Sequence, residues 1–247
     1  DRVLRSLPSV FAQMPKDAAI AIPLLEEAVK LQPDYGAAHA FLGWCLHHRF
    51  ARGGLREEDR VAAIQHAHAA IAYGSDDATA LAVAAQVIAW DEHDTTTALR
   101  LFDRALELSG SNVFALTLSA ITLAWMGKAE LAIERAERAI RLSPFDSYNF
   151  RSHHALAIAG FYNQRYKDAV DAARRAIGAN SSFSVARAVL AAALLRCGRA
   201  AEAKAAARDV LECEPTFTIR GISLTAELEP AVFRPLADAW REIGLPE

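Results

Sequence analysis

The sequence is poor in cysteine. Its 247 residues include three cysteines, Cys45, Cys197 and Cys213, and no two of them form a C-x-x-C pair. Such an odd and sparse set excludes a disulfide-stapled scaffold and is typical of a protein kept in a reducing compartment. We therefore expect a cytoplasmic protein.

Long apolar runs are also lacking. The two longest, residues 78–90 and 113–127, are too short to cross a bilayer with ease, and polar residues such as Gln86 and Thr117 interrupt them. We expect both runs to be buried helices, and we expect no membrane contact.

An excess of positive charge is missing as well. Lys and Arg number 27 against 30 Asp and Glu, which gives a formal net charge of −3. A general nucleic-acid binder usually carries a basic stripe, so we expect no direct nucleic-acid binding. The arginines near residue 138 alternate with glutamates at helical spacing, which is typical of a solvated helix face.

Motifs for catalysis and for metal binding are absent too. The sequence has no Gly-x-Ser-x-Gly, no P-loop, no dinucleotide-binding glycine pattern and no His-Glu-x-x-His. Its histidines are adjacent or two residues apart, as at His153 and His154, so on a helix they point in different directions and do not converge on an ion. We expect a chain without enzyme activity, catalytic residues, metal or cofactor.

What the sequence does contain is a repeat. A pattern of small and large apolar residues, such as Ala98, Phe102 and Ala105, recurs about every 34 residues and is followed each time by a turn. The residues that close the successive patterns are Pro33, Ser75, Gly110, Pro144, Ser181 and Pro215. Such a period indicates an array of helical hairpins, each packed on its neighbours.

The first half of each repeat follows a second pattern. Leu42, Gly43 and Leu46 fill the slots of W-x-x-L-G-x-x-Y, and the sixth repeat fills them with Leu190, Ala191 and Leu194. This pattern resembles the tetratricopeptide repeat (TPR). The resemblance implies an all-α fold, a TPR helix-hairpin solenoid that forms a right-handed superhelix.

The array is expected to cover residues 1–215, with a partial first repeat and five full repeats that close near 75, 110, 144, 181 and 215. Residues 216–229 are expected to be extended, and a capping helix with Trp240 on its apolar stripe is expected to complete the segment 216–247. Glycine is expected to end helices in the turns at Gly127 and Gly198.

Two repeats exceed the 34-residue period by about three residues or more. The second carries about eight extra residues, which we place in an Arg/Gly-rich turn within 49–60. The fifth carries about three, which we expect to lengthen its first helix toward Phe161 and Tyr162. Insertions in repeat proteins often gather on the binding face.

The two ends resemble a narrower group. Residues 4–7 and 24–35, together with 214–219 and 241–247, are similar to the C-terminal repeat region of bacterial class III adenylate/guanylate cyclases and of related winged-helix regulators. The resemblance implies a non-catalytic protein-interaction and sensory module for cAMP signal transduction, within an adenylate cyclase that works as a dimer. The cyclase metal-binding aspartates have no counterpart here. Because the chain starts at Asp1, we expect a piece of a longer protein.

Two other functions remain open. The chain could be a free-standing TPR adaptor that holds a partner peptide, or the effector arm of a winged-helix transcriptional regulator. What precedes Asp1 distinguishes these alternatives.

First helices line the concave groove of such arrays, and the slot numbering selects groove-facing residues that could bind a protein, a peptide or a small amphipathic ligand. These residues are Trp44, His47, His48, Gln86, Trp90, Thr117, Trp125, Tyr148, Arg151, Tyr162 and Arg196. The alternative is that the tryptophans only pack between repeats.

Overall fold

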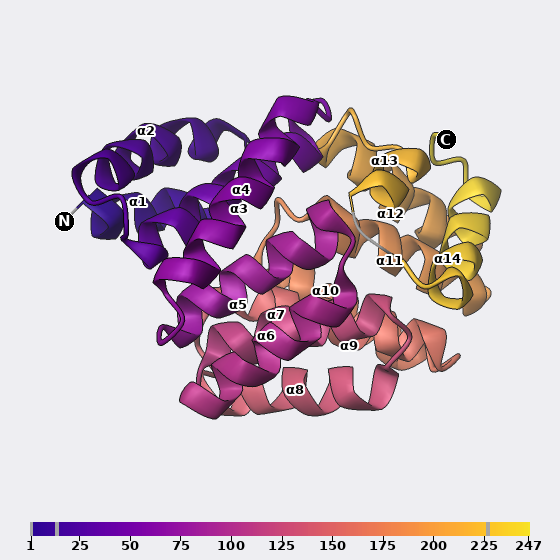
Figure 1. Cartoon of the computed structure of the whole chain (residues 1–247). Coiled ribbons are helices and arrows are strands. Elements are labelled where there is room, and N and C mark those ends of the chain that lie inside the picture. Colours follow the sequence, from indigo (N-terminus) through magenta and orange to yellow (C-terminus); the bar gives the residue numbers. More distant parts are fainter. Residues whose placement is uncertain (1, 13–14, 226–227) are drawn as a thin grey trace. The chain divides into compact units, whose positions relative to one another are not determined.

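The computed structural model describes residues 2–12, 15–225 and 228–247, and every regular element in these ranges is helical (Figure 1). The helices form consecutive antiparallel hairpins, as the repeat predicts. The chain divides into two compact units, Asp1–Ala115 (unit 1) and Leu116–Glu247 (unit 2), each described here by itself.

Unit 1 contains three hairpins, each made of a first and a second helical segment. Its elements are α1 (Arg2–Ala12), α2 (Pro15–Leu31), α3 (Gly36–Arg52), α4 (Glu57–Tyr73), α5 (Ala78–Val87), the π-helix η1 (Ile88–Glu92) and α6 (Thr95–Leu108). Alanines at the small slots, such as Ala63 and Ala98, are fully buried and let the helices approach closely.

Two helices of unit 1 approach each other closely at Gly36. A Cβ at this position would stand 2.6 Å from both Cα and N of Gly74, so only glycine fits. A glycine at each of these two positions therefore brings the start of α3 against the end of α4.

The insertion of the second repeat differs from the expectation. The helices α3 and α4 have 17 residues each, so most of the extra length continues the two helices, and the turn covers only 53–56. Asp59 in α4 accepts hydrogen bonds from Arg49 at 2.5 Å and from Arg56 at 2.8 Å. Burial would raise the pKa of Asp59, but these two arginines outweigh it and hold the pKa below its usual value. The arginines thus stabilise the extended hairpin.

The third repeat, from Ser75 to Gly110, is one residue longer than the 34-residue period. The π-helical turn η1 accommodates the extra residue at the end of α5. His93 then reverses the chain in the left-handed conformation (φ 58°), and Asp94 begins α6 by accepting a hydrogen bond from Thr97 N at 2.9 Å.

Unit 2 contains three further hairpins and two terminal helices. Its elements are α7 (Val113–Trp125, whose first residues belong to unit 1), α8 (Ala129–Leu142), the 3₁₀-helix η2 (Ser147–Asn149), α9 (Phe150–Tyr162), α10 (Tyr166–Ala179), α11 (Ser184–Arg196), α12 (Ala200–Cys213), α13 (Ile219–Leu224) and α14 (Pro230–Glu242). The glycine turns are confirmed, since Gly127 and Gly198 have φ of 73° and 75°.

The expected lengthening of the fifth repeat at Phe161 and Tyr162 is wrong. The helix α9 has 13 residues, as do α7 and α11, and the extra residues form η2 in front of it. Asp146 opens η2 by accepting a hydrogen bond from Tyr148 N at 2.8 Å. A polar cap thus fixes the added residues before the helix begins.

The segment 216–229 is not extended throughout, because α13 forms within it. Thr218 starts this helix by accepting a hydrogen bond from Gly221 N at 2.8 Å. The expected capping helix is present as α14, and it packs on α11 (Figure 1). Its buried Trp240 donates from Nε1 to Ala188 O at 2.8 Å, which anchors the end of unit 2.

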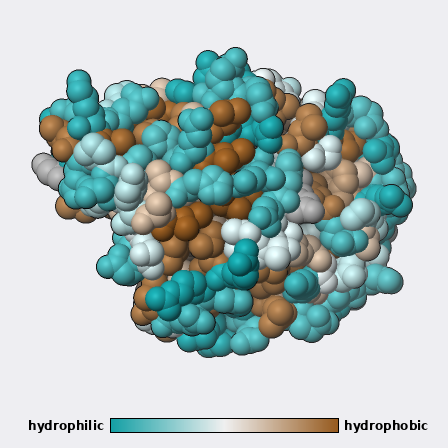
Figure 2. Space-filling view, viewed as in Figure 1, coloured by the Kyte–Doolittle hydropathy of each residue, from teal (hydrophilic) through white to brown (hydrophobic). Residues whose placement is uncertain are grey.

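Within the described ranges, no helix is long and apolar enough to cross a membrane. On the face shown in Figure 2, hydrophilic residues predominate and apolar residues lie between them. In unit 1, Leu4, Ile20 and Leu31 are exposed on α1 and α2.

Candidate functional site

The structure brings four of the five groove residues predicted in unit 1 into one aromatic cluster at the end of α3. Trp44, His47 and His48 lie on α3, and Trp90 lies in η1. The ring centroids of Trp44 and His48 are 4.6 Å apart, and those of His47 and Trp90 are 5.4 Å apart. The fifth residue, Gln86, is fully buried on α5. Trp90 is half-buried, whereas Trp44 and both histidines are buried.

A buried acid completes this cluster. Asp91 in η1 lies with Oδ1 2.8 Å from Nδ1 of His47, and the two side chains are 0% and 1% exposed. An ionised carboxylate only accepts, so Nδ1 donates this hydrogen bond. The second oxygen, Oδ2, is also buried but has no hydrogen-bond partner among the described residues. A buried polar atom without a partner costs free energy, and its presence suggests a role beyond packing.

The sequence analysis missed Asp91, although the repeat length held a signal for it. The single residue by which the third repeat exceeds its period produces η1, and η1 turns the Asp91 side chain toward α3. Arg60, from the insertion helix α4, donates to Asp91 O at 2.7 Å. The insertion and the π-helical turn therefore meet at this acid.

Unit 1 also holds a histidine pair outside the predicted groove. His39 Nδ1 lies 2.9 Å from His66 Nδ1, and His39 Nε2 lies 3.0 Å from Pro33 O. A carbonyl only accepts, so His39 donates from Nε2 and accepts from His66 at Nδ1. Burial, and next the neighbouring His39, lower the pKa of His66 to about 4. His66 is therefore neutral near pH 7, and the pair links α3 to α4.

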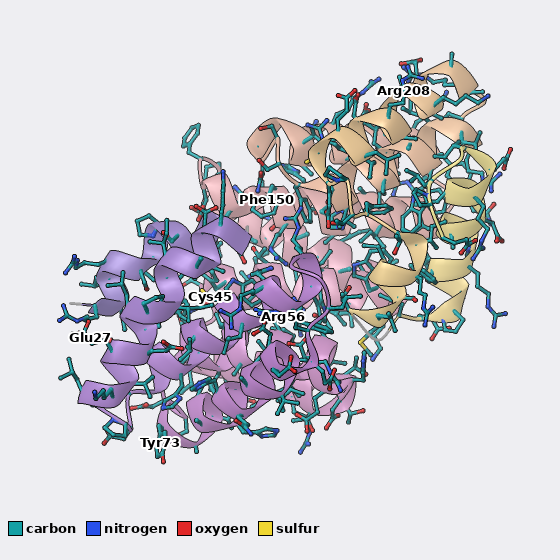
Figure 3. The ribbon with its side chains drawn as sticks, turned by 90° about the horizontal axis from the view of Figure 1, so that it is seen from above. Glu27, Cys45, Arg56, Tyr73, Phe150 and Arg208 are labelled. Atoms are coloured by element: carbon teal, nitrogen blue, oxygen red, sulfur yellow. The ribbon has the colours of Figure 1, made fainter. Side chains whose placement is uncertain are left out.

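Cys45 is not a nucleophile in this structure. It lies inside the ribbon of unit 1 (Figure 3), and burial raises the pKa of its thiol to about 12 despite the nearby Arg49. A thiol this far from its reactive thiolate form behaves as an apolar side chain.

In unit 2 the corresponding cluster is aromatic. Trp125 on α7 is buried, and its ring lies 6.2 Å from His154 on α9, which in turn lies 4.9 Å from the ring of Phe183. Burial, and next the charge of Arg151, lower the pKa of His154 to about 3. His154 is therefore neutral at pH 7, and its Nδ1 has no hydrogen-bond partner among the described residues.

Three other predicted residues of unit 2 are buried. Thr117 pairs with Ser152 at an Oγ1–Oγ distance of 3.0 Å. The guanidinium carbon of Arg151 lies 5.8 Å from the ring centroids of both Tyr148 and Phe150, within cation–π range. These contacts stabilise the start of α9.

Tyr162 and Arg196 are the predicted residues of unit 2 that reach solvent. Tyr162 is 37% exposed at the end of α9, and Arg196 pairs with Glu242 at 3.2 Å. Arg196 also borders a cavity of about 420 Å³ at the ends of the hairpins. Its other lining residues are Gln164, Arg165, Tyr166, Lys167, Asp168 and Cys197.

The burial of Trp44 and Trp125 favours packing for these two tryptophans, whereas Trp90, Tyr162 and Arg196 remain reachable by a partner.

In the part of the chain that the structure describes, no three His, Cys, Asp or Glu residues form a group that could hold a metal ion.

No protein-family model and no curated protein sequence matches this chain. Solved structures do match it. The human IFIT1 dimer with m7Gppp-AAAA shares 16% identity over 79% of this chain and 46% of its own, with a TM-score of 0.66. Cut9 of the APC/C hetero-tetramer Cut9-Hcn1 shares 14% over 85% and 39%, with a TM-score of 0.67.

PilF of Pseudomonas aeruginosa shares 17% identity over 85% of this chain and 88% of its own, with a TM-score of 0.58. These proteins are built of TPR hairpins, and the likeness shows that this chain has the fold of a TPR solenoid. The chain spans less than half the length of the IFIT1 and Cut9 chains.

Proposed function

We propose that this chain is a non-catalytic interaction module and that Trp90 of unit 1, supported by the buried residues Trp44, His47, His48 and Asp91, forms part of the surface that holds a protein or peptide partner. The observation that carries the proposal is the half-buried Trp90 ring, which packs on His47 beside the buried His47–Asp91 pair. A peptide laid along Trp90 would make an aromatic contact with the exposed part of its ring.

The fold supports the general part of this proposal, because TPR solenoids act mainly as binding surfaces. Human IFIT1 is solved with a capped RNA, but the net charge of −3 here does not favour RNA. We therefore propose a protein or peptide partner.

The binding proposal is tested by selecting peptides from a displayed library on the purified chain. Binding of the selected peptides should fall about tenfold or more in Trp90→Ala, and Trp90→Phe should retain much of it, because the ring remains. Phe145→Ala is the matched control, since Phe145 is an aromatic that is 99% exposed outside the cluster. Equal binding by Trp90→Ala and wild type would contradict the proposal.

We further propose that the module is the regulatory part of a cytoplasmic, dimeric nucleotide cyclase. The terminal segments that resemble cyclase repeat regions support this proposal. The test is to read the gene upstream of the Asp1 codon. If an in-frame cyclase domain precedes the chain, we expect Trp90→Ala to change the cyclase activity of the full protein. A winged-helix domain at that place would indicate the effector arm of a transcriptional regulator. A start codon just upstream of the Asp1 codon would indicate a free-standing TPR adaptor.

A further inference from the structure

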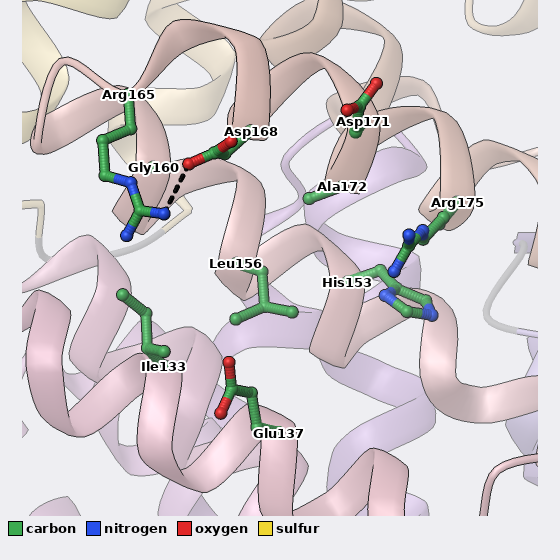
Figure 4. A pocket seen from close by; sticks show the side chains of 10 residues that line it. All are labelled: Ile133, Glu137, His153, Leu156, Gly160, Arg165, Asp168, Asp171, Ala172 and Arg175. Atoms are coloured by element: carbon green, nitrogen blue, oxygen red, sulfur yellow. Dashed lines mark ion pairs between the residues drawn. The ribbon is translucent and has the colours of Figure 1, made fainter.

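Unit 2 has a second cavity, of about 260 Å³, between the second helices α8 and α10 and above α9 (Figure 4). It is separate from the groove residues predicted above. Its apolar lining comes from Ile133 on α8, Leu156 on α9 and Ala172 on α10. The volume is below the range of about 300–1,000 Å³ typical of drug-sized ligands, so it suits a small molecule or a single side chain.

Helical spacing explains how the cavity is built. His153, Leu156 and Gly160 lie three and seven positions apart on α9 and so share one face. Gly160 lets α10 approach closely, since a Cβ there would lie 3.2 Å from Ala169 N. The α10 residues that line the cavity, from Asp168 to Arg175, span about 10 Å of helix.

Two of the three carboxylates around the cavity have their own cation. Asp168 pairs with Arg165 at 2.6 Å, and Glu137 pairs with Arg141 at 3.6 Å. Figure 4 shows the third, Asp171, directed away from the end of the cavity where Arg175 lies. The acids therefore do not neutralise that end.

At that end, Arg175 and His153 lie together, with the guanidinium over the imidazole (Figure 4). Asp171 and Arg175 are four residues apart on α10, a spacing that favours an ion pair, yet no ion pair joins Arg175 to any residue of the described chain. Nδ1 of His153 is buried and has no hydrogen-bond partner among the described residues. The guanidinium of Arg175 and the imidazole of His153 thus lie at the same end of this partly apolar cavity.

Burial, and next the charge of Arg175, lower the pKa of His153. The imidazole is therefore neutral near pH 7, and Arg175 supplies the positive charge at this end of the cavity. A carboxylate is the group that matches the guanidinium fork.

We propose that this cavity binds a small apolar carboxylate, which accepts hydrogen bonds from Arg175, lies beside the imidazole of His153 and lays its hydrocarbon part on Leu156 and Ile133. The carboxylate belongs either to a free acid or to the C-terminus of a peptide that ends in an aliphatic residue. This site is independent of the partner surface proposed for unit 1.

The test is titration of the whole chain with 4-methylpentanoate, followed by calorimetry and by NMR of the histidine side chains. We expect saturable heat and a saturable shift of the His153 signals, and neither with 4-methylpentanamide, which has the same shape without the charge. Comparison with an acetylated tripeptide ending in leucine distinguishes the sources. Tighter binding of the free acid indicates a small molecule, and tighter binding of the peptide indicates a C-terminus.

Variants sharpen the test. Arg175→Gln should weaken binding of 4-methylpentanoate about tenfold or more, because a charge-assisted hydrogen bond is lost. Arg174→Gln should not, since Arg174 makes the same charge change on the same helix but lies outside the cavity and pairs with Glu202. Both arginines are exposed, so both variants are expected to fold. Asp171→Asn should tighten binding, because it removes the one acid without an ion pair.

Three results would overturn the proposal: no saturable signal with either carboxylate, equal binding of the amide, or equal loss in Arg174→Gln and Arg175→Gln. Weaker binding of 4-methylpentanoate to Asp171→Asn would also overturn it, because removal of a nearby negative charge should favour an anion bound at this site.

Discussion

The two units treat a buried histidine beside a tryptophan in opposite ways. In unit 1, His47 next to Trp44 and Trp90 pairs with the buried carboxylate of Asp91. In unit 2, His154 next to Trp125 and Phe183 has no carboxylate partner and stays neutral among aromatic rings. Within one repeat fold, a buried histidine beside a tryptophan therefore belongs either to a polar pair or to an apolar filling.

The comparison separates function from packing. An imidazole without a carboxylate partner can be replaced by an apolar side chain with little loss, whereas a paired imidazole cannot. The polar cluster of unit 1 is thus the costlier arrangement, which is why we assign the partner surface to it. Four changes test this contrast.

The largest effect is expected for Asp91→Ala. It leaves His47 buried without its partner, and we expect the free energy of unfolding to fall by about 3 kcal/mol. Urea unfolding followed by tryptophan fluorescence measures it. Glu92→Ala is the control, because Glu92 is partly exposed and its pair with His68 lies at the surface. A loss below about 0.5 kcal/mol in Asp91→Ala would remove the contrast between the units.

Gly36→Ala should follow, with a loss of about 2 kcal/mol or more, because its Cβ would collide with the backbone of Gly74 at 2.6 Å. The matching change in unit 2 is Gly160→Ala, whose Cβ would meet Ala169 N at 3.2 Å, and we expect about 1 kcal/mol. Thermal unfolding of both variants measures the difference. Equal losses would mean that the two close approaches are equally tight.

The third change tests the pH dependence of unit 2. Burial and Arg151 place the pKa of His154 at about 3, whereas histidine in an unfolded chain titrates near 6.5. The unfolded chain therefore gains a proton that the folded chain does not bind, so stability present above pH 6.5 is lost as the pH falls.

Between pH 7 and pH 5, His154 should account for a loss of about 2 kcal/mol. His154→Leu should remove this part of the loss and leave stability at pH 7 equal or higher. Urea unfolding of the variant and wild type at both pH values measures it. An unchanged pH dependence in His154→Leu would mean that His154 does not titrate in this way.

The smallest effect is a gain. Gly178 lies within α10 of unit 2, and a Cβ there would meet no atom within 4 Å. We expect Gly178→Ala to stabilise unit 2 by about 0.5–1 kcal/mol through helix propensity alone. Differential scanning calorimetry can detect the rise in Tm. A lower Tm would show that the glycine has a conformational role.

The sequence predicted the hairpins and the turns at Gly127 and Gly198, because period and turn chemistry are local properties. It placed the extra residues of the second repeat within 49–60, but it did not predict the form that extra residues take. A longer repeat can lengthen helices, as in α3 and α4, add a π-helical turn, as in η1, or add a 3₁₀ turn, as in η2. Capping contacts and neighbouring helices decide among these outcomes. The number of extra residues in a repeat carries no information about either.

The predicted site shows the same limit. Slot numbering found Trp44, His47, His48 and Trp90, which the structure brings together, but it could not find Asp91, whose side chain meets His47 only because η1 widens the helix. Slot numbering also treated Trp44 and Trp90 alike, although Trp44 is buried and Trp90 is partly exposed to solvent. Exposure depends on neighbours far away in the sequence.

The turns inside successive hairpins each place a residue in the left-handed region, and these residues are Leu55, His93, Gly127, Gln164 and Gly198. The conformation is unfavourable for a residue with a Cβ and favourable for glycine. A deep mutational scan should therefore show glycine as the preferred residue at 55, 93 and 164. The repeat period would then appear in the scan as a regular series of sites at which substitution by glycine increases the stability of the protein.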